Sequence, residues 1–170
     1  MAICTLSNLI GNENTKAAIF SHSLDGRLLD CAISFLAHER VELRQISATL
    51  VYNFTLVCTS SKYGIGRWCP PGTATVTAIE GSQLEATLPE SAVQILCSVI
   101  GELTAEIDSA TRRRRLSCAL RIIRNCKVPA VALINDLGFS VYFHEMKLMT
   151  GISVEEAAIV HEVIQAIETS

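Results

Sequence analysis

The chain has 170 residues, of which 49% are apolar, 18% are charged and only 5% are aromatic. This length suits one domain with a sizeable core, and the scarcity of aromatic residues favours helix-on-helix packing over a β-sandwich. The formal net charge of −3 argues against a general attraction to nucleic acid, and no apolar run reaches the ~18 residues of a membrane span.

The first half of the chain predicts short helices that Gly and Asn residues interrupt. Apolar residues at three- and four-residue intervals mark the clearest of these helices, Val41–Cys58. The periodicity then ends, and several Gly and Pro residues predict a long loop over residues 59–83, with a brief strand at 73–79. Before Val41, we expect helical segments at residues 2–10, 15–20 and 23–38.

The second half predicts helices with recognisable first turns. A capping box is expected at Thr87 with Glu90, and a second one at Ser153 with Glu156. Between them, Asp108 or Ser109 begins a helix that carries four consecutive arginines. Shorter elements follow at Val128–Leu137 and Phe139–Met149, and the last helix is expected to turn the side chains of Ala157, Val160, Ile164 and Ile167 inward.

These elements predict an all-α fold of eight or nine short helices, in which neighbouring helices cover one another's apolar faces. Because no strict repeat is visible, an irregular armadillo-like α-solenoid fits better than a consensus array. The seven cysteines include no Cys-x-x-Cys pair, which predicts free thiols in a cytoplasmic or nuclear protein.

The sequence offers few of the parts that an enzyme needs. Three of the four histidines precede a glutamate, but none has a second histidine four residues on, so the zinc-protease pattern is absent. Cys69 lacks a nearby resolving cysteine, and neither a phosphate-binding glycine loop nor a nucleophile elbow occurs. We therefore predict no catalytic residues, no metal and no cofactor.

Residues 44–54, Arg-Gln-Ile-Ser-Ala-Thr-Leu-Val-Tyr-Asn-Phe, resemble the "Ala-Thr-Leu, two residues, Asn, aromatic" signature of PUL domains. These domains are the C-terminal modules of the phospholipase-activating protein family. Two further stretches, residues 7–12 and residues 115–120 followed by 133–138, resemble other segments of the family in the same order. The similarity spans nearly the whole chain.

The resemblance implies a single armadillo-like domain over residues 1–170, and a start inside the family's domain, without its first helix, is left open. It also implies a non-catalytic adaptor of the ubiquitin–proteasome pathway. Its partner would be the acidic C-terminal tail of the hexameric AAA ATPase valosin-containing protein, bound in a basic groove. Of the two arginines important in the family, one falls on Arg115, whereas the other position is Cys4 in this chain.

The predicted partner-binding residues are Arg115, Asn53, Asn8, Thr49 and Arg112. At about 100° per residue, Asn53 and Arg115 each lie roughly 60–70° from the apolar stripe of their own helix, on the same side. Both are therefore expected at one rim of a shared groove, where asparagine can satisfy peptide backbone groups and arginine can bind a carboxylate.

The other arginines of this helix fall elsewhere on the same helical projection. Arg112 lies close to the apolar stripe, whereas Arg114, Arg121 and Arg124 lie on the flank opposite to Arg115. Asn8 does not share the flank of Asn53.

Each assignment has a structural alternative. Asn53 could be buried with its amide satisfied by the backbone, and Arg115 could pair with a glutamate of the preceding helix. A buried Arg115 guanidinium would remove the cation that the adaptor hypothesis requires. The whole chain could instead be a structural or oligomerising domain of a larger protein. RNA binding through the arginine run is disfavoured by the acidic total and the lack of interleaved aromatic residues.

Overall fold

The computed structural model describes residue 5, residues 27–58, residue 88 and residues 90–169. Every regular element within these ranges is helical, so the predicted all-α class is confirmed for the described residues. Apart from residue 5, the predicted helices at 2–10 and 15–20 lie outside them, as do the loop at 59–83, Asn8 and Thr87 of the first predicted capping box. The elements are α3 (Arg27–Ser34), the short 3-10 helix η2 (Phe35–Ala37), α4 (Val41–Cys58), α5 (Glu90–Ile100), α6 (Ser109–Asp136), α7 (Ser140–Leu148) and α8 (Val154–Glu168).

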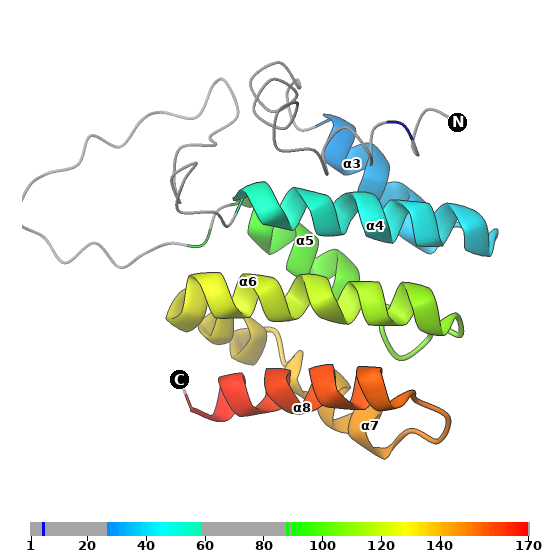
Figure 1. Ribbon diagram of the computed structural model, residues 1–170. Helices are drawn as coiled ribbons and strands as arrows, with labels where there is room; N and C mark the ends of the chain where they lie inside the picture. Colours follow the sequence, from blue (N-terminus) through cyan, green and yellow to red (C-terminus); the bar gives the residue numbers. More distant parts are fainter. Residues whose placement is uncertain (1–4, 6–26, 59–87, 89, 170) are drawn as a thin grey trace, which may run out of the picture.

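The helices form two layers. In Figure 1, α4, α6 and α8 lie side by side in the front layer and begin at the same edge of the molecule, whereas α3, α5 and α7 lie behind them. Helix α6 is central, because it contacts α4, α5 and α8. Because α3, α5 and α7 lie behind the front helices, they leave the front faces of α4, α6 and α8 uncovered.

Helix α4 spans the predicted residues Val41–Cys58. Leu50, Val51 and Phe54 are buried on one of its faces, as their spacing requires. The hydroxyl of Ser47 donates to the carbonyl of Ala32 in α3, which ties the two helices together at a buried polar position. The opposite face of α4 is left for polar side chains.

Helix α6 changes direction near its middle. Lys127 has φ 40° and ψ −117°, so two helical segments meet there. Pro129 explains the break, because proline has no N–H to donate and its ring crowds the carbonyl four residues earlier. The separate helix predicted from Val128 is thus the second segment of α6. Gly138, with φ 69°, lies just after its end.

The starts of α6 and α8 follow the predicted caps. The Asp108 side chain accepts from the backbone N–H of Thr111, and Ser153 with Glu156 forms the predicted capping box. One inward position in α8 was wrong, since Ala157 is exposed and Glu156 is fully buried instead. Glu156 is drawn inward by partners on α6, which are described below.

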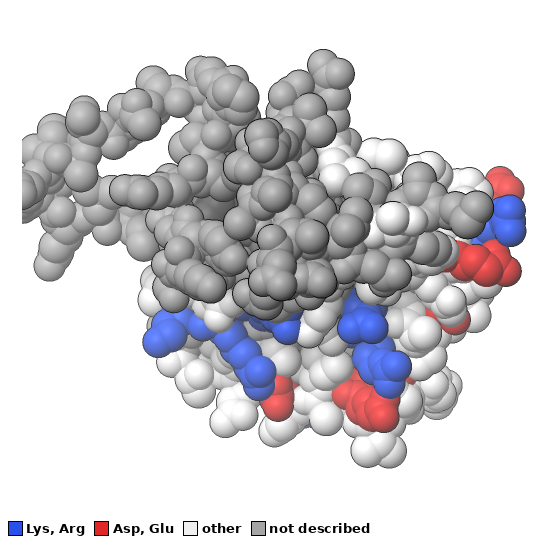
Figure 2. Space-filling view, turned by 45° about the horizontal axis from the view of Figure 1, so that its top comes forward, with Lys and Arg blue, Asp and Glu red and all other residues white. Residues whose placement is uncertain are grey.

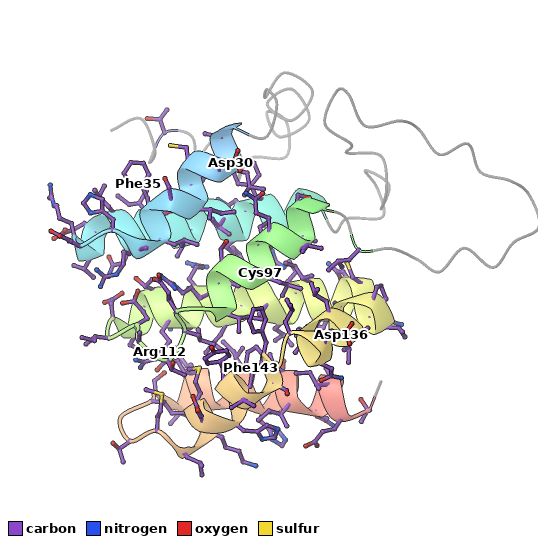
Figure 3. All side chains as sticks on the ribbon, turned by 180° about the vertical axis from the view of Figure 1, so that it is seen from behind. Asp30, Phe35, Cys97, Arg112, Asp136 and Phe143 are labelled. Carbon is purple, nitrogen blue, oxygen red and sulfur yellow. The ribbon has the colours of Figure 1, made fainter. Side chains whose placement is uncertain are left out.

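The apolar side chains of both layers form one core. Phe143 and Met146 of α7 are fully buried in it, and Figure 3 shows Phe143 between α7 and the front layer. No helix within the described ranges combines the length and apolarity needed to cross a bilayer. The core therefore lies against the rear faces of the front helices α4, α6 and α8.

Candidate partner-binding site

Arg115 does not lie at an open rim. Its side chain is 1% exposed, and its Nη2 donates to the carbonyl of Leu36 at 2.5 Å. The same nitrogen lies 3.5 Å from Glu106 and 3.8 Å from Glu102. The prediction that Arg115 lies at the rim of an open groove was therefore wrong. The alternative of an intramolecular ion pair describes its contacts, since Glu102 and Glu106 lie just after α5.

Burial changes the electrostatic environment of the Arg115 guanidinium. Desolvation lowers the pKa of its guanidinium, and the negative charges of Glu106 and Glu102 oppose that shift. Its Nε and Nη1 are buried without a hydrogen-bond partner. A peptide could reach this guanidinium only if the surrounding side chains moved, so a binding cation must be sought elsewhere.

Arg112 is buried as well. Its Nε donates to Glu156 at 2.7 Å and its Nη1 donates to the carbonyl of Glu106 at 2.8 Å. Figure 3 shows Arg112 between α6 and the α7–α8 pair. The projection placed Arg112 close to the apolar stripe, but its burial does not fit the predicted partner-binding role, because its side chain is 7% exposed in an ion pair between α6 and α8.

Two carboxylates at the starts of helices, Glu156 of α8 and Asp108 before α6, have lowered pKa values. Burial alone would raise the pKa of Glu156, but hydrogen bonds from Arg112, Ser153 and Ser109 hold it below its usual value of 4.5. In Asp108, desolvation raises the pKa, but hydrogen bonds from Thr111 and Gln45 together with the charge of Arg44 lower it overall. Both groups lie at helix N-termini, where the helix dipole also favours a negative charge.

The predicted residues of α4 lie on its polar side. Thr49 and Asn53 are half-buried, and the Thr49 hydroxyl donates to the carbonyl of Gln45 at 2.9 Å. One helical turn relates Thr49 to Asn53, so both lie on the same side as Tyr52. Tyr52 is half-buried and carries the contacts that connect α4 to the arginines of α6.

Two arginines of α6 stack on Tyr52. The guanidinium carbon of Arg121 lies 4.1 Å from the ring centroid, and that of Arg114 lies 4.9 Å from it. Arg121 Nη2 also donates to the Tyr52 hydroxyl. These are favourable cation–π distances. Arg114 and Arg121 therefore lie on a different side of α6 from Arg115, as the helical projection predicted, and this side faces Tyr52 of α4.

Neither of these two arginines forms an ion pair with a carboxylate of the described residues, and Arg121 Nη1 is buried without a partner. Their neighbours on α6 differ, since Arg113 pairs with Glu155 and Arg124 pairs with Glu162, both on α8. Figure 2 shows the basic side chains in a band across this side, with acidic side chains beside part of it. The positive charge is therefore balanced toward α8 and unbalanced toward α4.

We call the residues of this unbalanced surface the α4–α6 face. Its members are the half-buried polar side chains Thr49, Tyr52, Asn53, Arg114, Ser117 and Arg121. Sequence reasoning identified the α4 members Thr49 and Asn53 but missed the cations. The spacing of Arg114, Ser117 and Arg121 at three and four residues could have identified them as one helical stripe.

Within the described ranges, no group of three or more His, Cys, Asp or Glu side chains could hold a metal ion. Comparison with protein-family models, curated proteins and solved structures found no match for this chain.

Proposed function

We propose that this chain is a non-catalytic adaptor of PUL type that binds an acidic peptide on the α4–α6 face. The two helical layers are interpreted as an irregular armadillo-like α-solenoid, in which the front helices α4, α6 and α8 carry the partner-binding surface. This interpretation rests on the resemblance of residues 44–54 to the PUL signature and on the successive helix pairs in Figure 1.

The stacked arginines carry the proposal. Arg114 and Arg121 bring two positive charges to one aromatic ring, and no carboxylate of the described residues pairs with them. Like charges held together in a partly desolvated place are unfavourable, and a bound carboxylate would relieve that repulsion. Both side chains are half-buried, so a carboxylate could approach the accessible part of each guanidinium and accept a charge-assisted hydrogen bond there.

The polar residues of α4 fit an extended peptide. A peptide bound in an extended conformation has backbone N–H and C=O groups that need partners, and an asparagine side chain offers both a donor and an acceptor. Asn53 lies beside Tyr52 on the half-buried side of α4. The α4–α6 face therefore combines groups suited to a peptide backbone with groups suited to acidic side chains or a terminal carboxylate.

The proposed partner remains the acidic C-terminal tail of the AAA ATPase valosin-containing protein. In the form that the resemblance implies, Arg115 would bind this tail. Because Arg115 is 1% exposed, we assign the binding charge to Arg114 and Arg121 instead. Arg112 and Arg115 are assigned the role of positioning α6 between its neighbours.

Fluorescence anisotropy with a labelled peptide of this tail tests the proposal. We expect saturable binding that weakens as ionic strength rises, because exposed charges are screened by salt. A matched peptide whose acidic residues are replaced by their amides should bind more weakly. An absence of binding at low salt would contradict the proposal, and a dimer by light scattering without peptide affinity would favour the structural or oligomerising alternative.

A further inference from the structure

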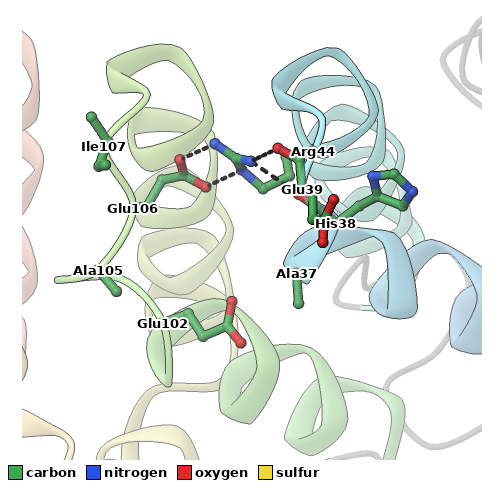
Figure 4. A pocket seen from close by; sticks show the side chains of 8 residues that line it. All are labelled: Ala37, His38, Glu39, Arg44, Glu102, Ala105, Glu106 and Ile107. Carbon is green, nitrogen blue, oxygen red and sulfur yellow. Dashed lines mark hydrogen bonds and ion pairs between the residues drawn. The ribbon is translucent and has the colours of Figure 1, made fainter.

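A small pocket lies between the η2–α4 connection and the α5–α6 turn (Figure 4). Its volume is about 260 Å³, which is below the ~300–1,000 Å³ of typical small-molecule sites and suits one inserted side chain. It belongs to neither the α4–α6 face nor the ion pair of Arg112. The lining residues are Ala37, His38, Glu39, Arg44, Glu102, Ala105, Glu106 and Ile107.

The cation that lines this pocket is already engaged. Arg44 Nε and Nη2 each donate to Glu106 at 3.0 Å, and Nη1 donates to the carbonyls of His38 and Glu39 at 2.9 Å. Figure 4 shows these bonds. The hydrogen bonds to Glu106 and its negative charge raise the pKa of the Arg44 guanidinium. Neither Arg44 nor the buried Glu106 has capacity left for a strong contact with a ligand.

Two carboxylates of the lining are not engaged in this way. The Glu102 side chain is 55% exposed, and its nearest cation, Arg115, lies 3.8 Å away, beyond hydrogen-bond length. Glu39 is exposed and forms no ion pair through its carboxylate within the described ranges. Three carboxylates line the pocket, and two of them, Glu102 and Glu106, lie against the guanidinium groups of Arg44 and Arg115, so one negative charge is in excess.

The remaining lining is aliphatic. Ile107 is 90% exposed at the pocket, and Ala37 and Ala105 add further apolar surface. A lysine side chain has the matching chemistry, because its methylene stem covers apolar surface while its compact ammonium group contacts a carboxylate. An arginine fits less well, since Glu106, the buried carboxylate suited to a two-pronged contact, already binds Arg44 in that manner.

We propose that this pocket binds a lysine side chain of a partner protein, with the ammonium group on Glu102 and the methylene stem on Ile107 and Ala105. The site is separate from the α4–α6 face and has the opposite charge preference. The adaptor would then contact partners through an acidic pocket at one place and a basic face at another.

The test is an NMR titration of the isotope-labelled full chain with N-acetyl-lysine N-methylamide. Saturable shifts are expected at the backbone amides of residues 37–39 and 102–107. The norleucine analogue has the same stem without the charge and should bind about tenfold more weakly, as should the lysine probe to a Glu102→Gln variant. Glu145→Gln, an exposed change on α7, is the matched control and should leave the affinity unchanged.

Three outcomes would overturn the proposal: no saturable shift, equal affinity for the norleucine analogue, or unchanged affinity in Glu102→Gln. Removing the charges of Arg114 and Arg121 should leave this titration unaffected. A failure here therefore says nothing against the peptide-binding proposal, and the reverse also holds.

Discussion

Neighbouring arginines of one helix have different roles because their partners differ. Arg112 and Arg115 lie inward and meet Glu156 and Glu106, whereas Arg114 stacks on Tyr52 in the half-buried polar surface. A helical projection of α6 placed Arg112 near the core. It could not reveal the glutamates, which come from other parts of the chain, and these partners decide whether an arginine is available to a ligand.

The pair Arg112–Glu156 predicts a large effect on stability. Its side chains are 7% and 0% exposed, so removing either one leaves a buried charge without its main partner. We expect Arg112→Ala to lower the free energy of unfolding by about 3–5 kcal/mol. Urea denaturation measures this, and the double change Arg112→Met with Glu156→Leu should cost less than either alanine substitution. A loss below about 1 kcal/mol would contradict the buried ion pair.

Arg115 predicts the outcome of a charge reversal. Arg115→Glu would place a carboxylate beside Glu106 and Glu102 in a site that is 1% exposed. We expect the cooperative thermal transition to be lost or strongly lowered, as followed by circular dichroism. Arg115→Met should retain the fold, because Glu106 keeps Arg44 as a partner. A stable Arg115→Glu protein would show that this guanidinium is more accessible than described.

At the scale of elements, local patterns were sufficient where local chemistry decides the outcome. The bounds of α4 and the caps at Asp108 and Ser153 follow from hydrophobic spacing and short-range hydrogen bonds, and they were predicted correctly. Ala157 was misplaced because spacing alone cannot anticipate that Glu156 turns inward to meet Arg112. The α4–α6 face was missed in part for the same reason, since it depends on how two distant helices pack.

The break in α6 predicts a stabilising substitution. Lys127 has φ 40° and ψ −117°, a conformation that strains an L-residue with a side chain but not glycine. Because Lys127 is exposed, we expect Lys127→Gly to raise the free energy of unfolding by about 1 kcal/mol. Lys127→Ala removes the same side chain without relieving strain and should give no gain in urea denaturation. A loss of stability with glycine would contradict the strained turn.

The helix caps predict the dependence of stability on pH. Folding lowers the pKa of Glu156 and of Asp108, so the folded state binds protons less readily than the unfolded state. The stabilisation that these two carboxylates give the folded state is therefore fully present at pH well above their usual pKa values of 4.5 and 3.8. It declines as the pH falls through their lowered pKa values in the folded state. Thermal melts between neutral and acidic pH should show this decline, with a shallower slope in Glu156→Gln.

At the scale of the whole molecule, the charges of the front layer are unevenly compensated. Toward α8, Arg113 and Arg124 have glutamate partners, and toward α4, Arg114 and Arg121 share Tyr52. The net charge of −3 hides this local excess of positive charge. We therefore expect an acidic peptide to bind the side of α6 that faces α4 in preference to the side that faces α8. A dependence on the total charge of the protein alone would not produce this preference.

Two double variants test this central claim most directly, because each removes two arginine charges from α6. They are Arg114→Gln with Arg121→Gln, and Arg113→Gln with Arg124→Gln. Calorimetric titration with the acidic tail peptide should show at least about tenfold weaker binding for the first variant and nearly unchanged binding for the second. Equal losses in both variants, or wild-type affinity in the first, would contradict a peptide site on the α4–α6 face.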